Sequence, residues 1–155
     1  MKTCEARISS PRARPVRGRG RGLGRHLSRK MGRAIGDYDM IHDGDRILVA
    51  VSGGKDSLTL LKILTERQAF VPVDYTLIPV HVDLGYACAD VEALKEYLRG
   101  QGHELLVRRD EILKETDEAR INCFWCAWNR RKVLFQWAAE LWCQKIALGH
   151  HRDDI

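Results

Sequence analysis

The chain has 155 residues, of which 45% are hydrophobic and 30% are charged, so it is long enough and apolar enough to bury a core. These values exclude a collagen, a coiled coil and a fully disordered chain, and no apolar run reaches the ~20 residues of a membrane-spanning helix. We therefore expect a globular protein that does not cross a membrane.

The formal net charge of +5 is unevenly distributed along the chain. The chain contains 26 Lys and Arg and 21 Asp and Glu. Residues 1–30 hold ten of the basic residues and a single acidic one, Glu5, which leaves 16 basic and 20 acidic residues in the remainder. The basic character therefore belongs to the N-terminal segment, and the body of the protein is mildly acidic.

Residues 1–24 are rich in Arg, Gly and Pro and hold few apolar side chains. We expect them to form a disordered tail ahead of one domain over residues 25–155. Three interpretations of the tail remain: a basic arm that contacts nucleic acid, a transit peptide, and a solvated extension or a misassigned start codon. The Gly and Pro residues oppose the amphipathic helix of a transit peptide. No apolar secretory signal is present, so we expect the five cysteines to be thiols or metal ligands in a reducing compartment.

From about Arg25 onward, segments with helical spacing of apolar residues alternate with short β-branched runs. Strands that alternate with helices are joined by right-handed crossovers, so the predicted fold class is α/β with a doubly wound parallel sheet. In chain order the pattern predicts a helix from about residue 25, a turn at 43–45, a strand over 46–51, a helix over 57–68, a strand over 75–82, a helix over 91–98, a strand over 104–107, a helix over 126–143 and a strand over 145–148.

The segment SGGKDS, residues 52–57, directly follows the first predicted strand and begins a helix. Two glycines allow the backbone to approach an anion closely, and the helix N-terminus favours phosphate. Serine hydroxyls can donate to phosphate oxygens, Lys55 adds a positive charge, and Asp56 can hold Mg²⁺. A Walker A loop needs Ser or Thr after the Lys, where this chain has Asp56. A strand–helix turn without a ligand is the alternative.

Cys123 and Cys126 are separated by two residues at the start of the predicted fourth helix. Two thiolates at this spacing can share a metal or cluster, but they do not complete a tetrahedral site. Cys143 lies about 25 Å further along that helix at 1.5 Å per residue, and nothing in the sequence points to Cys88 as a ligand. Three interpretations of the pair remain open. It is completed as a metal or cluster site by ligands outside this sequence, it is a redox dithiol, or it is two buried structural cysteines.

The same predicted helix carries aromatic and basic residues close to the cysteine pair. Trp125 and Trp128 favour core packing or shielding of a cluster over stacking on bases. Arg130, Arg131 and Lys132 fit phosphate contacts and a solvated helical face equally well.

Residues 149–155, GHHRDDI, begin at the carboxyl end of the fourth predicted strand. Carboxyl ends of parallel strands share one edge of a sheet, so we expect His150, Asp153 and Asp154 to face the same ligand as the SGGKDS loop. A carboxylate there can hold Mg²⁺ or orient the acceptor, and either Asp can also cap the next helix.

Together, the SGGKDS loop, the cysteine pair followed by two arginines, and GHHRDD resemble the tRNA 2-thiocytidine synthetase (TtcA) family of PP-loop ATP pyrophosphatases. The likeness covers about residues 25–155. It implies a Rossmann-like domain of the adenine nucleotide alpha hydrolase type. The resemblance also implies that the end of the second strand, His81, Val82 and Asp83, borders the adenosine, with the backbone of Val82 as the expected contact.

The resemblance implies an ATP-dependent sulfurtransferase that adenylates a cytidine of the tRNA anticodon loop and replaces its oxygen by sulfur. It implies ATP, Mg²⁺ and a four-iron–four-sulfur cluster as cofactors, and tRNA and a cysteine desulfurase or persulfide carrier as partners, in a cytoplasmic protein that is compatible with a homodimer. The implied ATP-binding residues are Ser52, Gly53, Gly54, Lys55, Asp56, Ser57, Val82 and His150, the implied catalytic residues are Asp56, Asp153 and Asp154, and the implied cluster ligands are Cys123 and Cys126.

The family's third cluster cysteine lies downstream of GHHRDD, whereas this chain stops at Ile155. We therefore expect an N-terminal fragment that is incomplete at the C-terminus. The sequence does not establish whether this fragment alone is active. Two alternatives remain: another PP-loop tRNA-modifying enzyme, making 2-thiouridine or lysidine, and a module that binds nucleotide or metal without catalysis.

Overall fold

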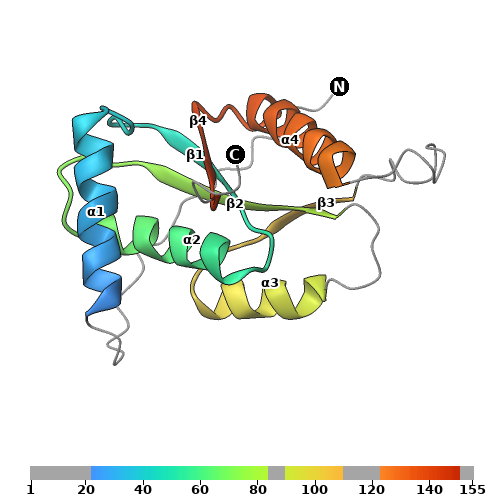
Figure 1. The fold of residues 1–155 in the computed structure, drawn as a ribbon, viewed down its shortest axis with the longest axis horizontal. Coiled ribbons are helices and arrows are strands. Elements are labelled where there is room, and N and C mark those ends of the chain that lie inside the picture. Colours follow the sequence, from blue (N-terminus) through green and yellow to red (C-terminus); the bar gives the residue numbers. More distant parts are fainter. Residues whose placement is uncertain (1–21, 84–89, 110–122, 151–155) are drawn as a thin grey trace, which may run out of the picture.

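The computed structural model describes residues 22–83, 90–109 and 123–150, with only the backbone at 123–126. Helices and strands alternate along it, as the apolar periodicity predicts (Figure 1). No helix in these ranges is both long and apolar enough to span a bilayer. The elements are α1 (Leu23–Asp37), β1 (Arg46–Ala50), α2 (Lys55–Arg67), β2 (Thr76–Asp83), α3 (Val91–Gly100), β3 (Leu106–Arg109), α4 (Cys123–Glu140) and β4 (Lys145–Leu148).

The four strands form one sheet in the order β3-β2-β1-β4, and all neighbours are parallel. From β1 the chain moves outward to β2 and β3, and it then crosses back to place β4 on the other side of β1. The direction of winding therefore reverses between β1 and β4. In open α/β sheets, the crevice at the carboxyl ends of the strands beside such a reversal is where ligands bind.

Helices cover both faces of the sheet: α1, α2 and α3 lie on one face and α4 on the other (Figure 1). Side chains of β1 alternate between the faces, with Ile47 and Val49 toward α2 and Leu48 toward α4. Each of these side chains is at most 2% exposed, and burial of one such side chain contributes about 1.5–3 kcal/mol. A sheet covered on both faces explains why its strands are continuous apolar runs rather than alternating ones.

The predicted doubly wound α/β fold is confirmed, and the boundary of α4 is corrected. The prediction extended this helix to Cys143, whereas it ends at Glu140. Trp142 has a φ of +54°, in the left-handed region that ends helices, and the Cys143 N–H donates to the Ala138 carbonyl at 2.8 Å. Cys143 therefore lies beyond the helix, half-buried, just before β4.

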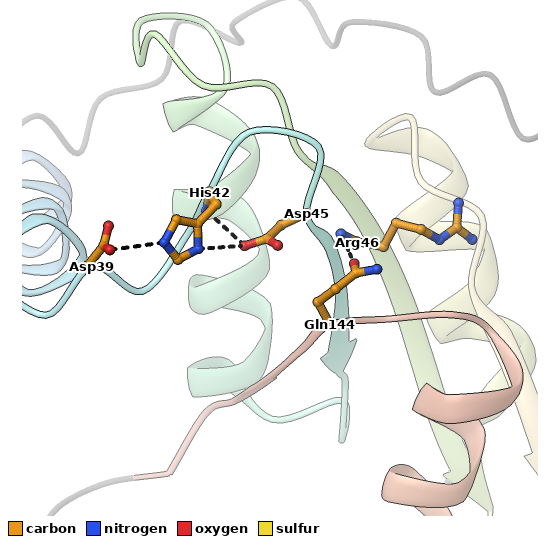
Figure 2. A network of polar contacts seen from close by, with 5 residues as sticks. All are labelled: Asp39, His42, Asp45, Arg46 and Gln144. Carbon is orange, nitrogen blue, oxygen red and sulfur yellow. Dashed lines mark hydrogen bonds and ion pairs between the residues drawn. The ribbon is translucent and has the colours of Figure 1, made fainter.

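A polar network closes the amino-terminal end of the sheet, opposite the ligand edge (Figure 2). The Arg46 N–H donates to Gln144 Oε1 at 2.8 Å, and the Gln144 N–H donates to the Arg46 carbonyl at 3.0 Å. The buried Asp45 carboxylate accepts from the His42 N–H at 2.8 Å, and the His42 ring lies 3.0 Å from Asp39 Oδ2. The two bonds between Arg46 and Gln144 hold the start of β4 beside the start of β1, in the register that brings their carboxyl ends together.

Candidate active site

The loop between β1 and α2 is shaped by two consecutive glycines. Val51 still pairs with the sheet, since its N–H donates to the Val80 carbonyl at 2.8 Å. Gly53 then takes a φ of +86°, which is strained for any residue with a side chain, and Gly54 precedes the first residue of α2, Lys55. The chain thus turns sharply from strand to helix, so that the first backbone N–H groups of α2 face the ligand edge.

Two serines hold this loop together from inside. Ser57 is 4% exposed, and its hydroxyl donates to the Gly54 carbonyl at 2.9 Å and accepts from the Ser52 N–H at 3.2 Å. The Ser52 hydroxyl accepts from the Gly54 N–H at 3.3 Å and lies 3.2 Å from the Ser57 hydroxyl. The hydroxyl hydrogen of Ser57 therefore points into the loop in this structure, and both serines preorganise the backbone donors.

Gly149 brings the end of β4 against the first turn of α2. A Cβ atom at this position would lie 2.8 Å from the Ser57 nitrogen, 2.9 Å from its Cα and 3.1 Å from the Asp56 carbonyl carbon. Real Cβ atoms do not approach backbone this closely, so only glycine allows the two backbones to meet. The sequence marks Gly149 as the end of a strand, but the contact joins segments more than 90 residues apart, which local pattern does not reveal.

A cavity of about 440 Å³ opens where β1, β2 and β4 end. It brings together residues that are far apart in the sequence, and it straddles the sheet between α2 and α4. Of the predicted site residues that the structure describes, four line it, while Gly53, Gly54, Lys55 and Asp56 continue the loop beside it. The predicted residues in its wall are Ser52, Ser57, Val82 and His150.

Arg130 and His81 also line this cavity. The sequence left Arg130 open between two alternatives, and the resemblance placed His81 beside the adenosine. All three residues of the basic triplet are exposed, but only Arg130, on α4, is among the described residues that line the cavity. Its position therefore favours contact with an anion. His81, on β2, is 7% exposed and contacts the Val51 carbonyl through Nδ1 at 2.7 Å.

Asp83 ends β2 at the rim of the same cavity. Its side chain is 20% exposed and lies 3.8 Å from the Arg109 guanidinium at the end of β3. This ion pair links the carboxyl ends of the two strands and places a partly neutralised carboxylate beside Val82.

The cysteine pair begins α4, with Cys123 and Cys126 as the first and fourth residues of the helix. Residues three apart share one helical face, and two thiols at a helix start suit an iron–sulfur cluster or zinc without completing its ligand set. Within the described ranges, no group of three or more His, Cys, Asp or Glu is placed to hold a metal. Asp153 and Asp154 lie outside the described residues.

The neighbourhood of the pair corrects one interpretation and supports another. Trp128 is 60% exposed, so the core-packing alternative is wrong for this residue. Cys143 follows the far end of α4, and burial raises the pKa of its thiol, which disfavours the thiolate form that metals bind. Both the position and the pKa of Cys143 therefore agree with its exclusion as a partner of the pair.

Comparison with known proteins assigns the fold to a family, because the family model described as the PP-loop domain matches residues 23–155. The chain belongs to the PP-loop family. The match starts at the first residue of α1 and includes every element of the sheet. The resemblance read from the motifs is thereby confirmed at the level of this family.

Several curated relatives of this PP-loop chain share the name tRNA-cytidine(32) 2-sulfurtransferase. The relative from Ralstonia pickettii is 48% identical and that from Erwinia tasmaniensis 44% identical, each over 128 residues, which are 80% of this chain and 41% of the relative. The relative from Deinococcus radiodurans is 44% identical over 80% of this chain and 43% of its own length. The chain thus spans less than half the length of these relatives.

A solved structure shares the fold: the U34-tRNA thiolase NcsA from Methanococcus maripaludis with its [4Fe-4S] cluster. The two superpose with a TM-score of 0.70 at 26% identity, over 84% of this chain and 46% of that one. The observed sheet and its helices are therefore those of a PP-loop domain.

Substitution of Gly149 by Ala tests the backbone contact between β4 and α2. The added methyl group has no room, so Gly149→Ala should lower the free energy of unfolding by about 1–3 kcal/mol, as overpacking does. The measurement is urea unfolding followed by circular dichroism. Gly36→Ala is the control, because a Cβ there meets nothing within 4 Å and Ala favours a helix such as α1. A Gly149→Ala variant as stable as the parent would contradict the contact.

Proposed function

We propose that the full-length protein is an ATP-dependent tRNA sulfurtransferase, which adenylates a cytidine of the anticodon loop and replaces its O2 atom by sulfur. The observation that carries the proposal is the SGGKDS loop, built between β1 and α2 at the edge of a cavity that opens at the reversal of the sheet. The names of relatives at 44–48% identity support cytidine as the target.

The loop suits the pyrophosphate part of ATP. Backbone N–H groups at the start of α2, together with the positive end of its dipole, favour the β- and γ-phosphates. Lys55 is exposed at the first position of the helix, and its ammonium group can stabilise the negative charge that develops on the leaving pyrophosphate. Asp56, in the first turn of α2, is the proposed Mg²⁺ ligand, joined by Asp153 or Asp154.

The cavity suits the reacting end of the nucleotide. Arg130 and His150 both line it, and both can contact an α-phosphate between the loop and the acceptor. In the proposed step, the cytidine O2 atom attacks the α-phosphorus and pyrophosphate departs. The C2–O bond is then activated, because AMP is a good leaving group. A sulfur nucleophile at the hydrosulfide level adds to C2, and AMP leaves with the oxygen.

We propose that Cys123 and Cys126 hold a four-iron–four-sulfur cluster together with a third cysteine from elsewhere in the full-length protein. When bound, the cluster would hold sulfur close to the activated base. The proposed sulfur source is a cysteine desulfurase or a persulfide carrier in the cytoplasm. A thiol reductant would release the outer sulfur of the persulfide as hydrosulfide and become a disulfide with the inner sulfur. The proposed assembly is a homodimer. The [4Fe-4S] cluster in the related thiolase supports the choice of metal over zinc.

The alternative target, uridine 34, is supported by the solved thiolase at 26% identity. The relatives named for cytidine 32 are 41–48% identical, and we therefore favour cytidine.

The loop's role can be tested in cells through the thiolated nucleosides of tRNA. Asp56→Ala in the full-length protein should reduce 2-thiocytidine at least tenfold, because the proposed Mg²⁺ ligand is removed while the loop backbone is kept. The measurement is mass spectrometry of nucleosides from digested tRNA. Glu66→Gln on the outer side of α2 is the matched control and should leave the level unchanged. Unchanged 2-thiocytidine in Asp56→Ala would contradict the proposal.

The cluster can be tested separately in anaerobically purified full-length protein. Cys123→Ser and Cys126→Ser should each lose the visible absorbance and most of the bound iron, because each removes one proposed ligand. Cys143→Ser, altered beyond the end of α4, should retain both. Iron retained by Cys123→Ser, or a colourless parent protein with one bound zinc, would contradict the cluster.

A further inference from the structure

The outer side of α1 carries a group of basic side chains that the proposed reaction does not use. They recur at spacings of three or four residues, so they share one side of the helix, and all are exposed. At 1.5 Å per residue they extend along about 12 Å of α1. The only acidic residue of the helix is its last one. We call this group the basic face of α1: Arg25, His26, Arg29, Lys30 and Arg33.

Three cations of the basic face have no carboxylate beside them. Among the residues that the structure describes, no ion pair involves Arg29, Lys30 or Arg33. By contrast, Lys62 on α2 and Lys95 on α3 lie 4.0 and 2.7 Å from glutamate oxygens. Like charges four residues apart repel, and cations in the first turns of a helix oppose its dipole. The basic face therefore concentrates positive charge that an anion would stabilise.

The opposite side of α1 fixes the basic face on the domain. Met31 and Ile35 pack against the core, and the Arg67 guanidinium donates to the Ser28 carbonyl at 3.2 Å. Arg67 is the last residue of α2, whose first residue, Lys55, belongs to the phosphate loop. Because α2 has 13 residues, about 20 Å of helix separates that loop from α1, which lies across the other end of α2 (Figure 1).

We propose that the basic face of α1 binds the phosphate backbone of the tRNA substrate while the target nucleoside lies at the cavity. Arg and Lys side chains on phosphates position a nucleic acid without reading its sequence. A span of about 20 Å corresponds to roughly six base pairs at about 3.4 Å each, so a stem next to the anticodon loop can reach from the cavity to α1. This inference rests on the proposed function and adds a surface that binds its substrate.

An anionic membrane is the competing partner for a basic amphipathic helix, which inserts its apolar side between lipids. Leu23 and Leu27 are 71% and 37% exposed at the start of α1. Met31 and Ile35, which continue the same side of the helix, pack against the core instead. No continuous apolar side is left to insert along α1, so the phosphates of RNA fit the basic face better than a lipid surface does.

The test compares two variants of the full-length protein that lose the same positive charge from different surfaces. Gln is a good helix former, so the substituted helices are kept. The measurement is equilibrium binding of unmodified tRNA over a range of salt concentrations, and calorimetric binding of ATP reports whether the domain is intact. The α1 variant combines Arg29→Gln, Lys30→Gln and Arg33→Gln, and the control, on α2 and α3, combines Lys62→Gln, Lys95→Gln and Arg99→Gln.

The α1 variant should bind tRNA at least tenfold more weakly than the parent at physiological salt. It should also reduce the slope of log K against log salt concentration by about 2–3, because each lost phosphate contact removes about 0.7–0.9 of that slope. Its affinity for ATP should equal that of the parent. The control should keep the parent's affinity for tRNA within about twofold and its slope unchanged.

Several outcomes overturn the inference. An α1 variant that binds tRNA as tightly as the parent, or a control that loses as much affinity, removes the surface and leaves the proposed function intact. A parent that binds no tRNA overturns the proposed function as well. Binding of the parent to phosphatidylserine vesicles that is lost in the α1 variant, with tRNA binding unchanged, assigns the basic face to a membrane instead.

Should the α1 variant also lose its affinity for ATP, the three single substitutions decide. Arg29→Gln, Lys30→Gln and Arg33→Gln should each reduce the salt slope by about 0.7–0.9 while ATP binding is kept. A slope that stays unchanged in all three contradicts the inference.

Discussion

The site depends on one backbone contact, the approach of Gly149 to the first turn of α2. A Cβ there would lie 2.8 Å from the Ser57 nitrogen, so the end of β4 and the start of α2 meet without any side chain between them. Because β4 is the strand reached after the winding reverses, this contact closes the switch point from one side. The phosphate loop, held internally by Ser52 and Ser57, is thereby supported by the sheet as well as by its own hydrogen bonds.

The two ends of the sheet have different structural roles. At the amino-terminal end, the exchange of hydrogen bonds between Arg46 and Gln144 fixes the spacing of β1 and β4, and the buried Asp45 bonds the His42 N–H in the turn before β1. At the carboxyl end, the same register leaves a cavity lined from α4 by Arg130 and from β2 by His81. A stable, fully bonded end and an open, polar end on one rigid sheet are what a preorganised nucleotide site requires.

Much of the fold follows from local pattern, since continuous apolar runs identify buried parallel strands and 3–4 residue spacing identifies the helices between them. The phosphate loop was also predictable from local pattern, because consecutive glycines between a strand and a helix are typical of a loop that binds phosphate. The end of α4 was not, since Trp142 adopts a left-handed conformation in which a Gly or Asn is expected. The role of Gly149 was missed because it is a contact between distant segments, which a single sequence does not display.

The central claim is that the loop before α2 holds the pyrophosphate of ATP, with the nucleoside toward β2. A crystal structure of the full-length protein with α,β-methylene-ATP, which resists cleavage between the α- and β-phosphates, tests it most directly. The account predicts β- and γ-phosphate oxygens within hydrogen-bond distance of backbone N–H groups in residues 52–57, and the nucleoside beside Val82. Phosphates bound away from this loop, or a nucleoside directed away from β2, would contradict it.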